Sequence, residues 1–414
     1  MSEPSSDLQA EILAEIAARG PIPFARFMDL CLYHPRLGYY TRGLGGGGGR
    51  DYLTSSGLHH VFGTLVARQA EEMWVRAGRP RRFAFVELGP GEGRFARDVL
   101  EQAERSPGFA AALRYLLLER SPALRDRQVL RLAGRTSVPV SWTSVEEIER
   151  EAPFEGCLFA NEVLDAFPVH RVVGTPDGVR EIHVAARDGL LMETLGPPST
   201  EAIVSFLEEA GIVLQDGQEV DLNLEAPRVL ARAVRLLSRG YVIVVDYGYE
   251  AGELYRPERR RGTLRAFHRH RIGEDYLLRP GEQDLTAHLD FSALTRAAAR
   301  AGARRLGRTT QSRFLLSLGA LECLPEPEPS GAPARRPEEA AARVRRLKER
   351  EALKELVLPD RMGERFHVLI FGVGGVPGDL AGLAEPWARA AASATAAAGA
   401  VPPPAAPPLP DART

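Results

Sequence analysis

Apolar residues recur at helical spacing in the first part of the chain. The spacing of Leu8, Ile12 and Ile16 predicts a helix over residues 7–18 with one apolar face. The same period predicts a short helix over 24–33 and a longer one over 58–77.

From about residue 82 the pattern changes to short apolar runs that alternate with helical segments. β-branched and aromatic residues fill these runs, and turn residues bound them, as expected of buried strands. The βαβα order predicts an α/β fold: a Rossmann-like parallel sheet with helices on both faces. Predicted strands lie at 82–88, 113–119, 138–142, 157–163, 241–248, 303–310 (an edge strand) and 366–373 (the final strand), with helices at 93–104, from Pro122, and at 291–302.

An insertion interrupts this alternation. Residues 169–240 contain hairpin-like runs and two helices, and we expect them to form a cap before the fifth strand. The expected parts are an N-terminal helical region that contributes to the active-site cleft (1–80), the core (81–168 and 241–324), the inserted cap (169–240), a Pro-rich linker (325–337), a helix and final core strand (338–375) and a disordered Ala/Pro-rich tail (376–414).

The composition is that of an ordinary soluble chain. Of 414 residues, 44% are hydrophobic and 26% charged, and the net charge of −2 predicts no general attraction to nucleic acid or anionic membranes. No apolar run approaches the roughly 20 residues of a membrane span. Cys31, Cys157 and Cys323 lie far apart and suggest no disulfide, and the polar N-terminus is unlike a targeting peptide. We therefore expect a cytoplasmic protein.

Lysine is almost absent from the chain. Lysine and arginine total 53, yet only Lys348 and Lys354 are lysine, so 51 are arginine. We attribute the arginine excess to codon bias rather than to a nucleic-acid surface, because 55 acidic residues balance it. The first 347 residues therefore exclude a Walker A phosphate loop, a Tyr-x-x-x-Lys dehydrogenase pair and a Schiff-base lysine.

A glycine-rich turn follows the first predicted strand of the sheet. Gly89, Pro90, Gly91 and Gly93 connect it to a helix, and such turns bring backbone and helix N-terminus close to a ligand. The spacing is G-x-G-x-G rather than the dinucleotide G-x-G-x-x-G. Two acidic residues, Glu87 and Glu92, would repel a pyrophosphate and suit the cationic S-adenosylmethionine. The alternative is a purely structural tight turn.

Two residues beyond the next strands complete a predicted nucleoside site. Glu119 ends the second strand, where a carboxylate can accept both hydroxyls of an adenosine ribose; alternatively, it caps the following helix. Trp142 follows the third strand and is placed to flank an adenine ring, although tryptophan is equally common in cores.

Acidic residues also follow the fourth strand, in the segment FANEVLDAFPVHR (159–171). Asn161 and Glu162 could face the transferred methyl group, and Asp165 lies one turn later; the alternative is a polar cap on a strand–helix junction. Asp246 and Tyr247, after the fifth strand, could close the cleft floor.

A basic cluster lies at His268, His270, Arg265, Arg269 and Arg271. We interpret it as a solvated loop, with a substrate-docking surface as the alternative. A metal site is disfavoured, because His-x-His here has no nearby cysteine or acidic ligands.

Taken together, these motifs resemble the MidA-like S-adenosylmethionine-dependent methyltransferases, a family that includes a mitochondrial complex I assembly factor that dimethylates a protein arginine. The resemblance runs from about Gly20 to Gly319, and it implies Thr54, Ser55 and Ser121 as further cofactor-binding residues. The matching segments are GPIPFARFMDLCLYHPRLGYY (20–40), GRDYLTS (49–55), VELGPGEG (86–93), LLERSPALRDRQ (117–128), ANEVLDAFPVHR (160–171), VVDYG (244–248), GTLRAFHRH (262–270) and PGEQDLTAHLDFSAL (280–294).

The sequence departs from the family in one segment. The family pattern Thr-Ser-Pro-Glu-Ile-Ser matches only at Thr54-Ser55, and the acidic residue expected next is missing from Ser56–His60. The carboxylates Glu162 and Asp165 are kept.

The resemblance implies methyl transfer to an arginine-containing protein. In this interpretation Glu162 clamps the guanidinium and Asp165 supports it, while Tyr39, Tyr40 and Phe167 line the acceptor slot. Three alternatives remain: a nicotinamide oxidoreductase, a non-catalytic assembly or binding factor, and a methyltransferase acting on a small molecule. The sequence leaves the oligomeric state open, including a homodimer.

Overall fold

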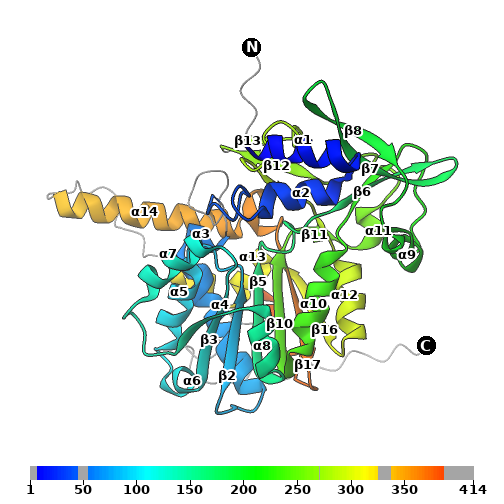
Figure 1. Cartoon of the computed structure of the whole chain (residues 1–414). Helices are drawn as coiled ribbons and strands as arrows, with labels where there is room; N and C mark the ends of the chain where they lie inside the picture. Colours follow the sequence, from blue (N-terminus) through cyan, green and yellow to red (C-terminus); the bar gives the residue numbers. More distant parts are fainter. Residues whose placement is uncertain (1–6, 45–54, 270, 325–336, 387–414) are drawn as a thin grey trace, which may run out of the picture.

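A seven-stranded sheet forms the centre of the molecule (Figure 1). The computed structural model describes residues 7–44, 55–269, 271–324 and 337–386. Five adjacent strands pair in parallel, as predicted, whereas the last strand of the chain, β17, runs antiparallel to both of its neighbours. The order across the sheet is β16 (Arg304–Thr310), β17 (His367–Val373), β10 (Leu237–Asp246), β5 (Phe154–Asn161), β2 (Phe83–Leu88), β3 (Leu113–Leu118) and β4 (Val140–Thr143).

Each face of this sheet is covered by helices, because successive side chains of a strand point to opposite faces. Phe83 and Phe85 pack on one side of β2, and Ala84 and Val86 on the other. The first face is covered by α4 (His60–Arg76), α5 (Arg94–Ala103), α13 (Gln311–Ser317) and the end of α14 (Pro337–Val357), and the second by α8 (Val145–Glu151), α10 (Glu225–Arg235) and α12 (Phe291–Arg300).

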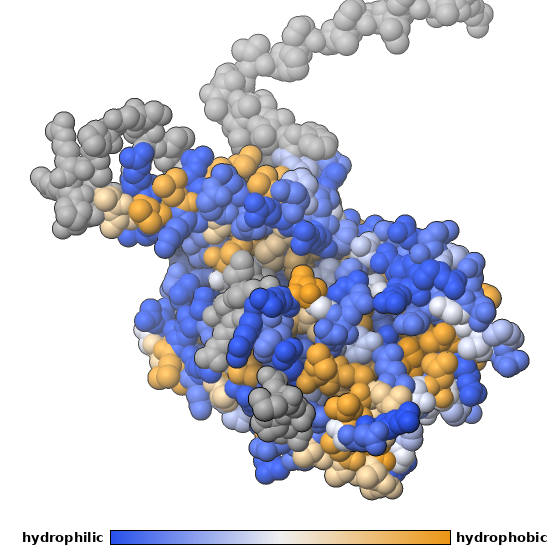
Figure 2. Space-filling model, turned by 90° about the horizontal axis from the view of Figure 1, so that it is seen from above, coloured by the Kyte–Doolittle hydropathy of each residue, from blue (hydrophilic) through white to orange (hydrophobic). Residues whose placement is uncertain are grey.

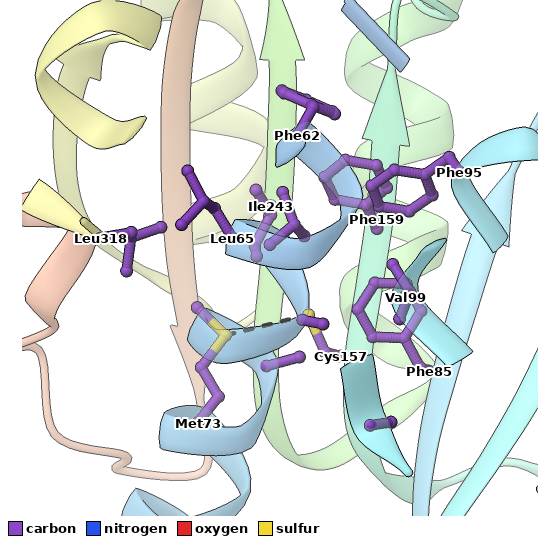
Figure 3. Packing of buried hydrophobic residues seen from close by; sticks show 14 of the residues in the cluster. Phe62, Leu65, Met73, Phe85, Phe95, Val99, Cys157, Phe159, Ile243 and Leu318 are labelled. Carbon is purple, nitrogen blue, oxygen red and sulfur yellow. Dashed lines mark hydrogen bonds between the residues drawn. The ribbon is translucent and has the colours of Figure 1, made fainter. Parts of the chain in front are cut away.

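Aromatic stacking organises the first face (Figure 3). The Phe95 ring of α5 lies parallel to the Phe159 ring of β5, with centroids 4.5 Å apart and an interplanar angle of 8°. Phe85 and Tyr115 also stack, at 5.2 Å. This packing fixes α5, and with it the turn from which α5 begins, against the sheet.

A cap lies over one end of the core sheet (Figure 1). Its apolar centre joins the two N-terminal helices to β7 and to a small three-stranded sheet. The cap consists of α1 (Asp7–Arg19), β1 (Ile22–Pro23), α2 (Phe24–Tyr33), β6 (His170–Thr175), β7 (Gly178–Arg187), β8 (Leu190–Gly196), α9 (Glu201–Ala210), β9 (Glu219–Leu222), β12 (Arg265–His268), β13 (Arg271–Gly273) and β14 (Asp284–Thr286).

Further short elements are α3 (Ser55–Leu58), α6 (Pro107–Ala112), α7 (Pro122–Leu132), β11 (Gly248–Tyr249), α11 (Ala251–Leu254) and β15 (Leu289–Asp290). Of these, α6 and α7 pack in the core through Phe109 and Leu132.

The cap and the core do not coincide with the residue ranges that the sequence predicted for them. Helix α10 falls within the range expected for the cap, yet Leu230 and Val234 pack on the core sheet. The strands β12 and β14 fall within the expected core range but pack in the cap. Helical spacing shows that one face of α10 is apolar, but it does not show which sheet that face covers.

The C-terminal part also differs from expectation. Within the range predicted to be a disordered tail, Val376 and Leu380 are buried against the core, and the Gly382 N–H donates to Gln69 Oε1 at 2.9 Å. Residues 387–414, and residues 325–336 of the predicted linker, lie outside the described residues. The exposed Val344 and Leu347 lie on α14, and Figure 2 shows hydrophobic surface on this projecting helix.

The Phe95–Phe159 stack should be a main determinant of stability. We expect Phe159→Ala to lower the free energy of unfolding by about 3–5 kcal/mol, because it removes a fully buried ring and leaves a cavity. Urea denaturation measures the change. Leu130→Ala is the control, since Leu130 is 80% exposed and should change the value by less than about 0.5 kcal/mol. Equal effects of the two changes would contradict the stack's importance.

Candidate active site

The site lies where the connections of the core sheet diverge. Strands β2 and β5 are neighbours, and the chain runs from β2 through α5 to β3 on the far side of β2. At such a switch point the loops leave the carboxyl ends of two strands in opposite directions and open a crevice for a ligand. The glycine turn follows β2, and Asn161 and Glu162 follow β5, so both predicted motifs meet there.

The glycine turn takes a conformation that requires glycine. Gly89, Gly91 and Gly93 have φ values of 61°, 52° and 74°, a region that favours glycine. A Cβ atom at Gly89 would lie 2.8 Å from Val163 Cγ2. Pro90 closes the turn by accepting a hydrogen bond from the Gly93 N–H at 2.8 Å, and α5 begins at the next residue.

Glu87 and Glu92 do not present two carboxylates to the ligand, contrary to the electrostatic argument from the sequence. Glu87 is buried and accepts a hydrogen bond from Tyr115 Oη at 2.7 Å; burial raises its pKa to about 8, which favours the neutral form at pH 7. Glu92 pairs with Arg94 at 3.0 Å and with Arg131 at 3.4 Å. The turn therefore offers backbone groups to a ligand, rather than two unpaired carboxylates.

Glu119 lies at the end of β3 in a polar cluster. Its carboxylate accepts from the Ser121 N–H at 2.7 Å and from Gln128 Nε2 at 3.2 Å, and burial raises its pKa. Ser121, not Glu119, caps helix α7, because its Oγ accepts from the Leu124 N–H. Trp142 is partly buried against the core, and its Nε1 donates to Gln128 Oε1 at 2.8 Å.

Glu162 takes an unusual backbone conformation directly after β5. Its φ is 52°, a left-handed value that costs a non-glycine residue roughly 1–3 kcal/mol and is common at functional sites. Glu162 Oε1 accepts from the Ser55 N–H at 2.8 Å and from Asn161 Nδ2 at 3.1 Å. Burial raises the Glu162 pKa to about 8. Thr54 lies outside the described residues.

Further buried acids surround Asp165. The Asp165 N–H donates to Asp246 Oδ2 at 3.3 Å, and Tyr247 donates its side-chain hydrogen bond to Asp165. Asp284 is also buried and accepts from Tyr40 Oη at 2.8 Å. Burial raises the pKa of Asp165 and of Asp246, and neighbouring carboxylates raise both further.

Glu162, Asp165, Asp246 and Asp284 form this acidic cluster. Among the described residues, no arginine or lysine side chain pairs with Glu162, Asp165 or Asp246. The described part of the chain also contains no group of acidic, histidine and cysteine ligands that could hold a metal ion. Such a cluster favours an organic cation as ligand, because a buried carboxylate needs a partner to ionise.

The structure places the three aromatic residues predicted to line the acceptor slot in different surroundings. Tyr40 reaches the acidic cluster through Asp284. Tyr39 is buried in the centre of the cap, and Phe167 packs against the face of the sheet that α10 covers. The basic cluster forms the hairpin of β12 and β13, with His268 Nδ1 3.1 Å from Glu282 O; His270 lies outside the described residues.

Two residues of the site, Gln128 and Asp284, were missed by the sequence reasoning. Both lie in segments that resemble the family. Gln128 is also seven residues after the helix cap Ser121, so helical spacing places both on the same side of α7.

Known proteins resemble this chain over most of its length. Residues 65–309 match the family model described as "Putative S-adenosyl-L-methionine-dependent methyltransferase". The chain belongs to this family.

Experimental structures agree with that assignment. A COG1565 superfamily member from Burkholderia thailandensis, solved with bound S-adenosyl-homocysteine, superposes with a TM-score of 0.78 at 30% identity, covering 93% of this chain and 98% of that one.

Curated sequences related to this chain include two proteins named protein arginine methyltransferase NDUFAF7. That of Xenopus tropicalis is 29% identical over 77% of this chain and 76% of its own length. That of Homo sapiens is 27% identical over 88% of this chain and 83% of its own length.

The residues of this methyltransferase fit S-adenosylmethionine. The turn offers backbone groups where a Cβ atom would intrude, and Glu119 offers carboxylate oxygens at the end of β3. Asn161 Oδ1 is buried and has no hydrogen-bond partner among the described residues, so an ammonium group of the ligand would satisfy it. The predicted cofactor class is thus confirmed, and the oxidoreductase alternative is abandoned.

The glycine turn allows a sharp test of cofactor binding. We expect Gly89→Ala to weaken binding of S-adenosylhomocysteine at least tenfold, because the new methyl group would displace Val163 and shift the turn. Isothermal titration calorimetry measures the affinity.

Gly78→Ala is the matched control. Gly78 also has a positive φ, 95°, but a Cβ atom there would meet nothing within 4 Å. Both changes should cost roughly 1–2 kcal/mol of stability through backbone strain. Only the change at Gly89 should alter affinity, and an unaltered affinity there would contradict the assignment of the turn.

Proposed function

We propose that this methyltransferase transfers a methyl group to the guanidinium of an arginine side chain in a protein. The acidic cluster is the observation that supports this proposal. It places several carboxyl groups beside the carboxyl edge of β5, and no arginine or lysine in the described part of the chain pairs with Glu162, Asp165 or Asp246. Relatives named protein arginine methyltransferase support the same acceptor.

A guanidinium satisfies the chemistry of this cluster. It is planar and cationic, and a carboxylate can accept two of its N–H bonds in parallel. The cofactor supplies an electrophilic methyl group, and the protein must place a guanidinium nitrogen in line behind it. Fixed orientation of this kind contributes up to roughly 7–11 kcal/mol in the best cases.

Glu162 is the best candidate for the clamp, because hydrogen bonds hold its carboxyl group in place after β5. Ser55 N–H and Asn161 Nδ2 donate to Oε1, and the Ser55 side chain also hydrogen-bonds to the carboxyl group. Glu162 has a pKa near 8, so it must first lose its own proton when the cationic acceptor binds; the resulting carboxylate can then take up the proton that the guanidinium loses during or after transfer.

The departure from the family pattern at Ser56–His60 leaves this contact in place. Ser55 is fully buried, and its Oγ donates to Gln311 Oε1 at 2.7 Å while its N–H binds Glu162. His59 caps α4 by accepting from the Val61 N–H. The acidic residue missing from this segment is thus not required to hold Glu162, which argues against a non-catalytic role.

We propose the cytoplasm as the location. Free, separate cysteines are consistent with a reducing compartment; Cys31 and Cys157 are buried. No described helix has the length and hydrophobicity needed to cross a bilayer. The curated relatives are named as mitochondrial proteins, so cell fractionation is the appropriate test.

Labelling of a host lysate with isotopic S-adenosylmethionine tests the proposed acceptor. The lysate should come from cells that lack the protein, and the protein or its Glu162→Gln variant is added back. Mass spectrometry should find methylarginine on a protein only with the unaltered enzyme. Label on a small molecule, on another residue type or equally with both proteins would contradict the proposal.

Glu162→Gln should separate function from stability. We expect methyl transfer to fall about 10²–10⁴-fold, as for loss of a group that moves a proton, while S-adenosylhomocysteine affinity stays within twofold. Glu101→Gln, at a 58% exposed carboxylate, is the matched control and should change neither. Full activity of the Glu162 variant would remove this residue from the mechanism.

The same variant should gain relative stability as pH rises. Glu162 has a pKa of about 8 in the folded protein, above the ordinary value of about 4.3, so the folded state holds a proton that the unfolded state has lost. The unfolding free energy of the unaltered protein, relative to Glu162→Gln, should therefore fall between about pH 5 and pH 8. Urea titrations at several pH values measure this difference; a difference independent of pH would show that Glu162 ionises normally.

A further inference from the structure

Gln128 is a completely buried polar residue among the groups that face the cofactor. It lies on α7, and its side chain reaches the glycine turn, the end of β3 and the side chain of Trp142 on β4. Its importance did not follow from the sequence motifs.

The amide of Gln128 uses both of its ends. Its Nε2 donates to Gly91 O at 2.7 Å and to Glu119 Oε2 at 3.2 Å, and its Oε1 accepts from Trp142 Nε1 at 2.8 Å. Two acceptors surround the nitrogen and one donor faces the oxygen, so only one amide orientation satisfies all three partners.

The aliphatic part of the same side chain supports the turn. Gln128 Cγ would lie 3.1 Å from a Cβ atom at Gly93, so the glycine and the glutamine pack directly against each other. The Gln128 side chain therefore contacts four residues from four parts of the site. They are Gly93 before α5, Gly91 in the turn, Glu119 after β3 and Trp142 on β4.

We propose that Gln128 is the positioning residue of the cofactor site: it holds the glycine turn, Glu119 and Trp142 in one arrangement before the adenosine part of S-adenosylmethionine binds. A ligand then binds without reorganising three separate elements. Preorganisation of this kind improves affinity by removing an ordering cost rather than by adding a contact. The proposal rests on the cofactor class, and not on the identity of the acceptor.

A structural role alone would not require this chemistry. A leucine or methionine would fill the same volume in a core that is already rich in apolar side chains. Such a residue would remove the hydrogen bonds that Gln128 makes with Trp142 Nε1 and Glu119 Oε2. Both side chains could then rotate.

Two substitutions and a matched control test the proposal. Gln128→Leu removes all three hydrogen bonds. Gln69→Leu is the control, because Gln69 is equally buried and also hydrogen-bonded through both ends, to Glu72 and to the Gly382 N–H, but lies on α4. Both changes should lower the melting temperature. Calorimetry should show S-adenosylhomocysteine binding weakened at least tenfold for Gln128→Leu and unchanged within twofold for Gln69→Leu.

Gln128→Glu adds a readout that a packing defect would not produce. A protonated glutamate keeps one donor, whereas an ionised one would repel Gly91 O and Glu119. The other charged or titratable groups nearby are Glu87, which is hydrogen-bonded to Tyr115, and Glu92, which is paired with Arg94, Arg127 and Arg131. The ratio of variant to unaltered dissociation constant should therefore rise steadily from pH 5.5 to pH 8.

Three results would overturn the proposal. They are binding by Gln128→Leu within twofold of the unaltered protein, an equal loss of affinity in Gln69→Leu, and a Gln128→Glu ratio that does not change with pH. Failure of the unaltered protein to bind S-adenosylhomocysteine would overturn the cofactor class itself, and this proposal with it.

Discussion

The acceptor side of this enzyme depends on carboxyl groups that have no arginine or lysine partner within the described residues, namely those of Glu162, Asp165 and Asp246. Asp165 and Asp246 are buried and Glu162 is half-buried, and all three have raised pKa values. Ionising these groups in the free protein is unfavourable, because desolvation and mutual repulsion both oppose it. A cationic acceptor reverses that balance, so the same feature that reduces stability provides selectivity for a positive, hydrogen-bonding group.

The cap and the core each contribute half of this arrangement. Glu162 and Asp246 follow the ends of core strands β5 and β10, whereas Asp284 and Tyr40 come from the cap. Contacts across the junction hold the two halves together: Tyr33 Oη donates to Ala166 O at 3.1 Å, and the Ala287 N–H donates to Asp165 O at 3.0 Å. The cofactor side does not depend on clustered carboxyl groups. The backbone of the glycine turn and one buried side-chain amide, that of Gln128, determine its geometry.

The sequence predicted those parts of the site that follow directly from local pattern. The glycine turn was readable because few residues tolerate positive φ, and Asn161 and Glu162 were readable because parallel strands end at a common edge. The electrostatic argument from Glu87 and Glu92 failed, since neither the burial of Glu87 nor the pairing of Glu92 with Arg131 is visible in sequence. Asp284 was missed for a related reason: it joins the cluster from a strand more than a hundred residues away from Asp165, by tertiary contact alone.

Proton release on acceptor binding shows directly whether the acidic cluster receives the guanidinium. An arginine-containing acceptor peptide is titrated into the S-adenosylhomocysteine-bound protein near pH 7, in buffers of different ionisation enthalpy. If the acidic cluster takes up the guanidinium, its carboxyl groups must lose protons as the cation enters, so the binding heat should depend on the buffer and indicate net proton release. The release should be lost in Glu162→Gln. Binding without proton release, or with the same release in that variant, would contradict the account.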